Sequence, residues 1–195
     1  MKKGQTGFTL IEIAIVLVII GLLLGGVLKG QELINSAKVK NLANDMRAIQ
    51  TAVFAFQDKY KALPGDYLAA TANSTFGGTG YTTGDGNGVI SAAEAPDAWD
   101  QLRKGNLITG SGTTAPANAV GGALAISGTA AAFVTGLAGN VVVCSGAIPG
   151  ALARQLDIAM DDGVSNAGNL RSAKATGAAD TAYVDADSYT VCMSF

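Results

Sequence analysis

The side chains of this chain that are best suited to chemistry lie between positions 83 and 94. The segment Thr83-Gly84-Asp85-Gly86-Asn87-Gly88-Val89-Ile90-Ser91-Ala92-Ala93-Glu94 aligns with a calcium loop of the form D-x-[DN]-x-[DN]-G-x5-E. Four oxygen donors are the predicted calcium ligands, namely Asp85, Asn87, the carbonyl of Val89, and Glu94. Thr83 stands where the pattern has its first aspartate, so the match is incomplete. The alternative is a Gly-Asn turn followed by a capped helix over Ala92–Arg103.

Other catalytic groups are scarce. The chain has no histidine, which removes the commonest general base and the commonest metal ligand. Zinc hydrolases, Ser-His-Asp hydrolases and Cys-His proteases therefore fit poorly. Carboxylate pairs such as Asp161 and Asp162, or a Ser-Lys pair, remain. Neighbouring acids alone are weak evidence, so a membrane-anchored enzyme is the disfavoured function and no catalytic residue is predicted.

The two cysteines, Cys144 and Cys192, both lie in the polar C-terminal part. An even pair in an exported segment is typical of one disulfide bond. That bond closes a loop with a sequence separation of 48 residues. Chain-entropy arguments give such a bridge roughly 4 kcal/mol of stabilisation. Two buried free thiols in a cytosolic protein are the alternative.

A single acid interrupts the long apolar run near the N-terminus. Phe8–Leu28 comprises 21 residues, which as a helix spans about 31 Å and matches the ~30 Å hydrocarbon core of a bilayer. Lys2 and Lys3 precede the run, which predicts a cytoplasmic N-terminus and a C-terminal bulk on the other side. Glu12 lies inside this run. An unpaired carboxylate is costly there, so Glu12 is expected to have a partner.

The alternative to a membrane helix is a secretory signal peptide. Such a peptide has a cleavage site with small residues after its apolar core. No A-x-A site follows Leu28, where the chain continues Lys29-Gly30-Gln31-Glu32.

The segment Gly7-Phe8-Thr9-Leu10-Ile11-Glu12 resembles the G-F-T-L-I-E signature of type IV prepilins and pseudopilins. The resemblance is specific over Gly7–Leu28, extends along the helix to about Pro64, and says little about the remainder. It implies that a prepilin peptidase cuts between Gly7 and Phe8 and N-methylates Phe8. It also implies that Glu12 pairs with the free amino terminus of a neighbouring subunit during assembly. Because either charge alone is costly in a low dielectric, such a pair fixes the register between subunits.

Beyond Lys29 the apolar pattern becomes one-sided. Apolar residues recur at spacings of three and four, at Val39, Leu42, Met46, Ile49, Val53, Phe56 and Tyr60. The Pro-Gly pair at 64–65 indicates a turn that ends the helix. The sequence thus predicts one helix over Phe8–Lys61, with an exposed apolar first half and a second half that packs against a globular head.

The predicted head is an antiparallel sheet laid on the amphipathic helix, which gives an α+β fold. Strands are expected at 140–144 and 188–193, with a weaker candidate at 123–127, and a short helix is expected over Pro149–Met160. The Gly/Thr/Ala-rich stretches 71–84 and 109–132 are expected to be surface loops. Residues 62–195 contain five basic and eleven acidic side chains, which argues against a nucleic-acid site.

These observations divide the chain into four parts. Residues 1–7 are a leader that is removed, 8–28 a transmembrane and filament-core helix, 29–61 an amphipathic helix, and 62–195 a head with a C-terminal disulfide loop. The predicted function is that of a structural subunit of a type IV pilus, which polymerises through its N-terminal helices into an extracellular filament for adhesion, motility or DNA uptake. The alternative is a minor pseudopilin of a type II secretion system in a periplasmic filament.

The predicted partners are further copies of the chain, a prepilin peptidase, the inner-membrane assembly machinery and, before assembly, the lipid bilayer. The expected location is the bacterial inner membrane, crossed once with the C-terminus in the periplasm, and then the pilus on the cell surface. No cofactor is expected except Ca²⁺ at the loop described above.

Overall fold

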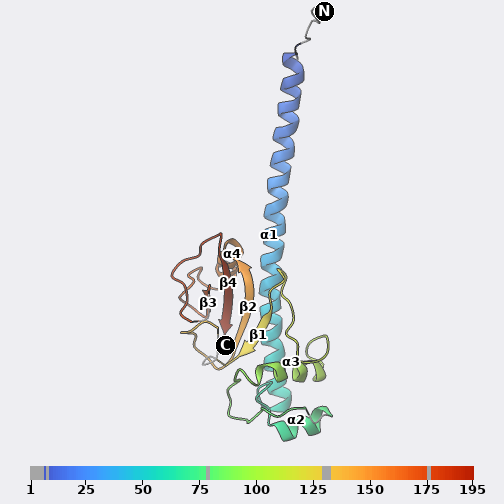
Figure 1. The fold of residues 1–195 in the computed structure, drawn as a ribbon, viewed down its shortest axis with the longest axis vertical. Coiled ribbons are helices and arrows are strands. Elements are labelled where there is room, and N and C mark those ends of the chain that lie inside the picture. Colours follow the sequence, from blue (N-terminus) through green and yellow to red (C-terminus); the bar gives the residue numbers. More distant parts are fainter. Residues whose placement is uncertain (1–6, 8, 78–79, 129–132, 175–176) are drawn as a thin grey trace, which may run out of the picture. The chain divides into compact units, whose positions relative to one another are not determined.

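The described residues form a long N-terminal helix, a four-stranded sheet and three shorter helices (Figure 1). The computed structural model describes residues 7, 9–77, 80–128, 133–174 and 177–195. The elements follow the order α1 (Leu10–Tyr60), α2 (Ala69–Phe76), α3 (Ala95–Lys104), β1 (Leu124–Ser127), β2 (Val142–Pro149), α4 (Gly150–Met160), β3 (Leu170–Ala173) and β4 (Ser188–Ser194). The predicted α+β class is confirmed.

The chain forms two compact units, residues 1–37 and residues 38–195. In the first unit the described part of α1 has no buried residue, and its large apolar side chains are exposed, such as Leu17 at 63% and Leu22 at 74%. The helix is long and apolar enough here to cross a membrane, judged by length and composition.

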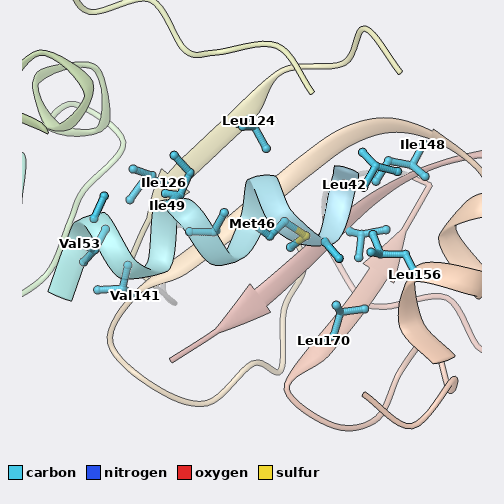
Figure 2. Packing of buried hydrophobic residues seen from close by; sticks show 14 of the residues in the cluster. Leu42, Met46, Ile49, Val53, Leu124, Ile126, Val141, Ile148, Leu156 and Leu170 are labelled. Atoms are coloured by element: carbon cyan, nitrogen blue, oxygen red, sulfur yellow. The ribbon is translucent and has the colours of Figure 1, made fainter. Parts of the chain in front are cut away.

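In the second unit the amphipathic stripe of α1 forms one side of the core. Six of the seven predicted stripe residues, those from Val39 to Phe56, are buried. The seventh, Tyr60, is partly buried and packs against them. Figure 2 shows Leu42 close to Ile148 and Leu156 at one end of this segment, and Val53 near Ile126 at the other. Burial of each such side chain contributes roughly 1.5–3 kcal/mol. The stripe therefore attaches the helix to the sheet.

The sheet is antiparallel throughout, with strand order β1-β2-β4-β3. The central strands β2 and β4 place Cys144 opposite Cys192, and a disulfide bond joins these two buried residues. The predicted cysteine pair is confirmed. The 48-residue loop between them contains α4 and β3.

Several boundaries differ from the expectations. Helix α1 ends at Tyr60 because Lys61 adopts φ +57°, and the predicted start at Phe8 lies outside the described residues. The predicted helix Ala92–Arg103 begins three residues later, as α3, and ends one residue later. The predicted strand at 140–144 begins at Val142 and continues to Pro149.

The prediction of a surface loop over 71–84 is wrong for residues 71–76, which belong to α2. The aromatic ring of Phe76 packs near the rings of Phe56, Tyr60 and Tyr67, so tertiary contacts override the weak local helix preference of this segment. The short strand β3 was not predicted. Within 109–132 the structure places β1 and a buried Asn118, while residues 129–132 lie outside the described part.

Candidate functional site

The N-terminal motif begins as the cap of α1. The backbone N–H and the hydroxyl of Thr9 each donate to Oε2 of Glu12 at 2.8 Å, and the N–H of Glu12 donates to Oγ1 of Thr9 at 3.3 Å. These reciprocal bonds form a capping box, which satisfies backbone donors that a helix start leaves open. Sequence reasoning assigned no role to Thr9, although the T-x-x-E spacing is a signal for this arrangement.

The residues of the predicted processing step lie just before this cap. Gly7 is exposed, and no atom lies within 4 Å of the position that a Cβ would take. Phe8 lies outside the described residues. A chain segment without crowding around Gly7 suits access by a peptidase.

Glu12 has hydrogen bonds but no counter-charge. Of the ion pairs among the described residues, none includes Glu12, and its bonds come from Thr9 alone. A carboxylate has about four lone-pair sites, so Oε1 remains able to accept from a cationic group of another molecule.

A second candidate site brings three carboxylates together in the second unit. Side-chain oxygens of Asp66, Asp85 and Glu94 lie within 4.8 Å of one another. Asp66 and Glu94 are each 2% exposed, whereas Asp85 is exposed. Three clustered acids are a donor set that hard cations such as Ca²⁺ prefer.

Backbone N–H groups of the loop hold these carboxylates in place. The N–H of Asn87 donates to Oδ1 of Asp66 at 2.9 Å, and the N–H of Gly88 donates to Oδ2 at 2.8 Å. Glu94 accepts from the N–H of Ser91 at 2.7 Å. A Cβ at Gly65 would lie 2.7 Å from the carbonyl oxygen of Glu94, so glycine permits this close approach.

The structure partly changes the predicted ligand set. Asp85 and Glu94 come together as expected, and Asn87 lies beside them with its Nδ2 donating to Oδ2 of Asp85 at 2.9 Å. Thr83 is directed elsewhere, since its hydroxyl donates to Asp97 at 2.9 Å. Asp66 supplies the carboxylate that Thr83 lacks. Asp66 was missed because it lies 19 residues before Asp85, directly after the Pro-Gly pair that ends the helix.

The surroundings of Asp66 oppose the ionisation of its carboxyl group. Burial raises the pKa of Asp66, and the nearby Glu94 charge adds to that effect, although N–H bonds from the loop act the other way. Among the described residues no lysine or arginine forms an ion pair with any of the three acids. A bound cation would relieve this repulsion, so the residues present fit a calcium ion.

A second acidic group, Asp157, Asp161 and Asp162, has a structural explanation. The hydroxyl of Tyr183 donates to the buried Asp157 at 2.6 Å, and the N–H of Leu170 donates to Asp161 at 2.8 Å. Burial raises the pKa of Asp157, and it also raises the pKa of Tyr183, together with the hydrogen bond to Asp157. These contacts fasten the segments that flank α4 and β3.

Comparison with known families addresses the N-terminal segment. Residues 2–28 match the sequence model described as the prokaryotic N-terminal methylation motif, the signature of type IV pilins and pseudopilins. This chain carries a pilin-type N-terminus. Searches of the curated proteins and of the solved structures returned no match.

The pilin-type motif marks the chain as a substrate for a prepilin peptidase and implies handling by a pilus-type assembly machinery. The exposed apolar half of α1 fits a pilin that is anchored in a membrane before assembly. The capping box of Thr9 and Glu12 lies within the matched residues.

Proposed function

We propose that this pilin-type chain is a structural subunit of a type IV pilus, which leaves the bacterial inner membrane and polymerises into a filament on the cell surface. The observation that carries the proposal is the uncovered apolar segment of α1 from Leu10 to Leu28, which lies in the methylation motif and contains one acid, Glu12. Lipid covers this surface before assembly, and the same surface of other copies covers it in the filament.

Processing prepares the ionic contact between subunits. Cleavage between Gly7 and Phe8 removes Lys2 and Lys3 and creates a new amino terminus at Phe8. Glu12 then lies four residues after that amine in the same chain. The amine need not be the only partner of Glu12, since other copies of the chain carry the same amine. The carboxylate, held by Thr9, accepts from the ammonium of a neighbouring copy, so a subunit displaced along the bundle leaves two charges unpaired.

Replacement of Glu12 tests this proposal. Glu12→Ala is expected to give processed subunits that stay in the membrane, with sheared filament yield reduced at least tenfold. Glu32→Ala is the matched control, because Glu32 is an exposed acid on the same helix that pairs with Lys29 at 2.6 Å. Mass spectrometry of sheared material is expected to find methylated Phe8 as the first residue. Normal filament yield from Glu12→Ala would refute the proposal.

The alternative is a pseudopilin of a type II secretion system. The long disulfide loop between Cys144 and Cys192 favours a pilin because it resembles the bridged loop in the heads of that group. Electron microscopy of sheared cell surfaces distinguishes the two, since a periplasmic pseudopilus leaves no surface filaments.

We further propose that the head binds Ca²⁺ through Asp66, Asp85 and Glu94, with Asn87 and the Val89 carbonyl completing the loop. The support is the convergence of three carboxylates, none of which forms an ion pair with a lysine or arginine among the described residues. Calcium is expected to raise the melting temperature of residues 38–195 in wild type and to have no such effect in Asp66→Asn. Asp162→Asn is the control, because Asp162 is an exposed acid outside this cluster. Calorimetry that detects no calcium binding to wild type would exclude the site.

A further inference from the structure

Asn87 and Gly88 form the only Asn-Gly pair in the sequence. Asparagine followed by glycine is prone to spontaneous deamidation, because glycine has no Cβ to hinder attack by its backbone nitrogen on the asparagine side chain. Both residues are exposed, on the loop that precedes α3. Gly88 adopts φ +84°, which favours glycine, so the fold itself selects the residue that makes the pair reactive.

Deamidation needs two groups of this pair to meet. The backbone nitrogen of Gly88 gives its proton to the solvent and attacks Cγ of Asn87, so that an N–Cγ bond forms. The Cγ–Nδ2 bond breaks, the departing nitrogen takes up a proton, and ammonia leaves a cyclic imide behind. Water then opens the imide at either carbonyl and gives an aspartyl or an isoaspartyl residue at position 87. The net reaction consumes one water molecule and releases one ammonia.

The folded chain holds each of the reacting groups by a hydrogen bond. The N–H of Gly88 donates to Oδ2 of Asp66 at 2.8 Å, so the nucleophile keeps its proton and is directed toward a carboxylate. Nδ2 of Asn87 donates to Oδ2 of Asp85 at 2.9 Å. Oδ1 of Asn87 accepts from the N–H of Val89 at 2.8 Å. Attack on Cγ therefore requires that the bond between Gly88 and Asp66 breaks first.

Asp66 is well placed to control this step. It is 2% exposed and lies directly after the Pro-Gly pair that follows α1. Its carboxylate also accepts from the N–H of Asn87 at 2.9 Å, and its backbone carbonyl accepts from the N–H of Gly86 at 2.9 Å. Separation of the loop from Asp66 leaves a buried carboxylate without these donors, which is unfavourable. The open form of the loop is therefore a minor population.

We propose that Asn87 is a spontaneous modification site of the head, and that Asp66 controls the rate of its deamidation by binding the N–H of Gly88. The reaction proceeds from the population in which the loop has separated from Asp66, so its rate is the intrinsic rate multiplied by that population. This proposal depends on neither the filament nor calcium, since every contact it uses lies within one chain.

Deamidation also prevents the loop from closing again. The product has a negative charge next to Asp85, whose carboxylate lies within 4.8 Å of those of Asp66 and Glu94. Like charges so close together repel one another. In the isoaspartyl product the backbone contains one additional carbon atom, so its N–H groups no longer match the two oxygens of Asp66. An opening that is reversible before the reaction becomes permanent after it.

Mass spectrometry of the full-length chain in detergent tests the proposal, with a chelator present so that no cation adds to the hold on the loop. The fraction deamidated at Asn87 is followed during incubation at mildly alkaline pH. Folded wild type is expected to react at least about tenfold more slowly than the same chain in guanidinium chloride. Asp66→Asn is expected to react at least about tenfold faster than folded wild type. Asp185→Asn is the control and is expected to keep the wild-type rate, because Asp185 is an exposed acid outside this loop.

Hydrogen exchange in wild type gives a readout that does not depend on whether Asp66→Asn folds. Exchange of the Gly88 amide requires the same bond to Asp66 to break. Its protection factor is therefore expected to be about the factor by which folding slows deamidation. Asn87→Gln is expected to abolish the mass gain, which assigns it to this position. Equal deamidation rates in folded and unfolded wild type would overturn the proposal, and so would an unprotected Gly88 amide or a wild-type rate in folded Asp66→Asn.

Discussion

The two halves of α1 share a backbone conformation and differ in what covers them. Between residues 10 and 37 no described side chain is buried, whereas between residues 38 and 60 Leu42, Met46 and Phe56 are fully buried. The stretch from Leu10 to Leu28 is apolar on all faces except for Glu12, and the second half has an apolar stripe at spacings of three and four. The exposed apolar side chains of the first half need a cover from outside the chain, such as lipid or other copies. The apolar stripe of the second half is covered by the sheet of the same chain.

The largest expected effect comes from separating the halves. A chain that begins at Lys38 keeps the whole buried stripe and loses the uncovered apolar surface. It is expected to be a monomer in buffer without detergent, as measured by sedimentation equilibrium, whereas the full chain is expected to require detergent or to assemble. Aggregation of residues 38–195 would show that the second half also depends on an external cover.

A smaller effect distinguishes the two faces of the second half. Phe56 is fully buried and its ring lies 4.5 Å from that of Tyr60, so Phe56→Ala is expected to cost about 3–5 kcal/mol of unfolding free energy. Phe54 is 49% exposed and contacts Phe195 at its edge, so Phe54→Ala is expected to cost about 1 kcal/mol or less. Urea unfolding of residues 38–195 measures both. Equal losses would contradict a one-sided helix.

The smallest expected effect concerns the pH dependence of the folded second unit. Because burial raises the pKa of Asp157 above its ordinary value of 3.8, the folded state holds this proton more tightly than the unfolded state. The contribution of Asp157 to stability is therefore present below that value and is lost as pH rises through the raised folded pKa. Asp157→Asn is expected to reduce this loss in urea unfolding at a series of pH values. An unchanged pH profile would show that Asp157 does not cause this loss of stability.

The sequence predicted the features that depend on local pattern. The spacing from Val39 to Phe56 predicted the buried face of α1, and the β-branched segments around Cys144 and Cys192 predicted the two strands that the disulfide joins. The G-F-T-L-I-E segment predicted the methylation motif that the family comparison found.

The features that were missed depend on contacts between distant segments. Helix α2 forms because Phe76 reaches an aromatic cluster on α1, and no local pattern of residues 71–76 indicates that cluster. Asp66 joins Asp85 and Glu94 through hydrogen bonds to a loop about twenty residues later. Strand β3 has a polar, unremarkable sequence and is held by pairing with β4.

The bond between Cys144 and Cys192 has a mechanical consequence for a protein pulled along its length. It fastens the two central strands to each other, so tension on the chain cannot straighten the segment between the two cysteines, whose sequence separation is 48. At about 3.4 Å per residue that segment would otherwise add roughly 160 Å of slack. Any extension under load must therefore come from α1, from the chain before Cys144, or from sliding between neighbouring molecules.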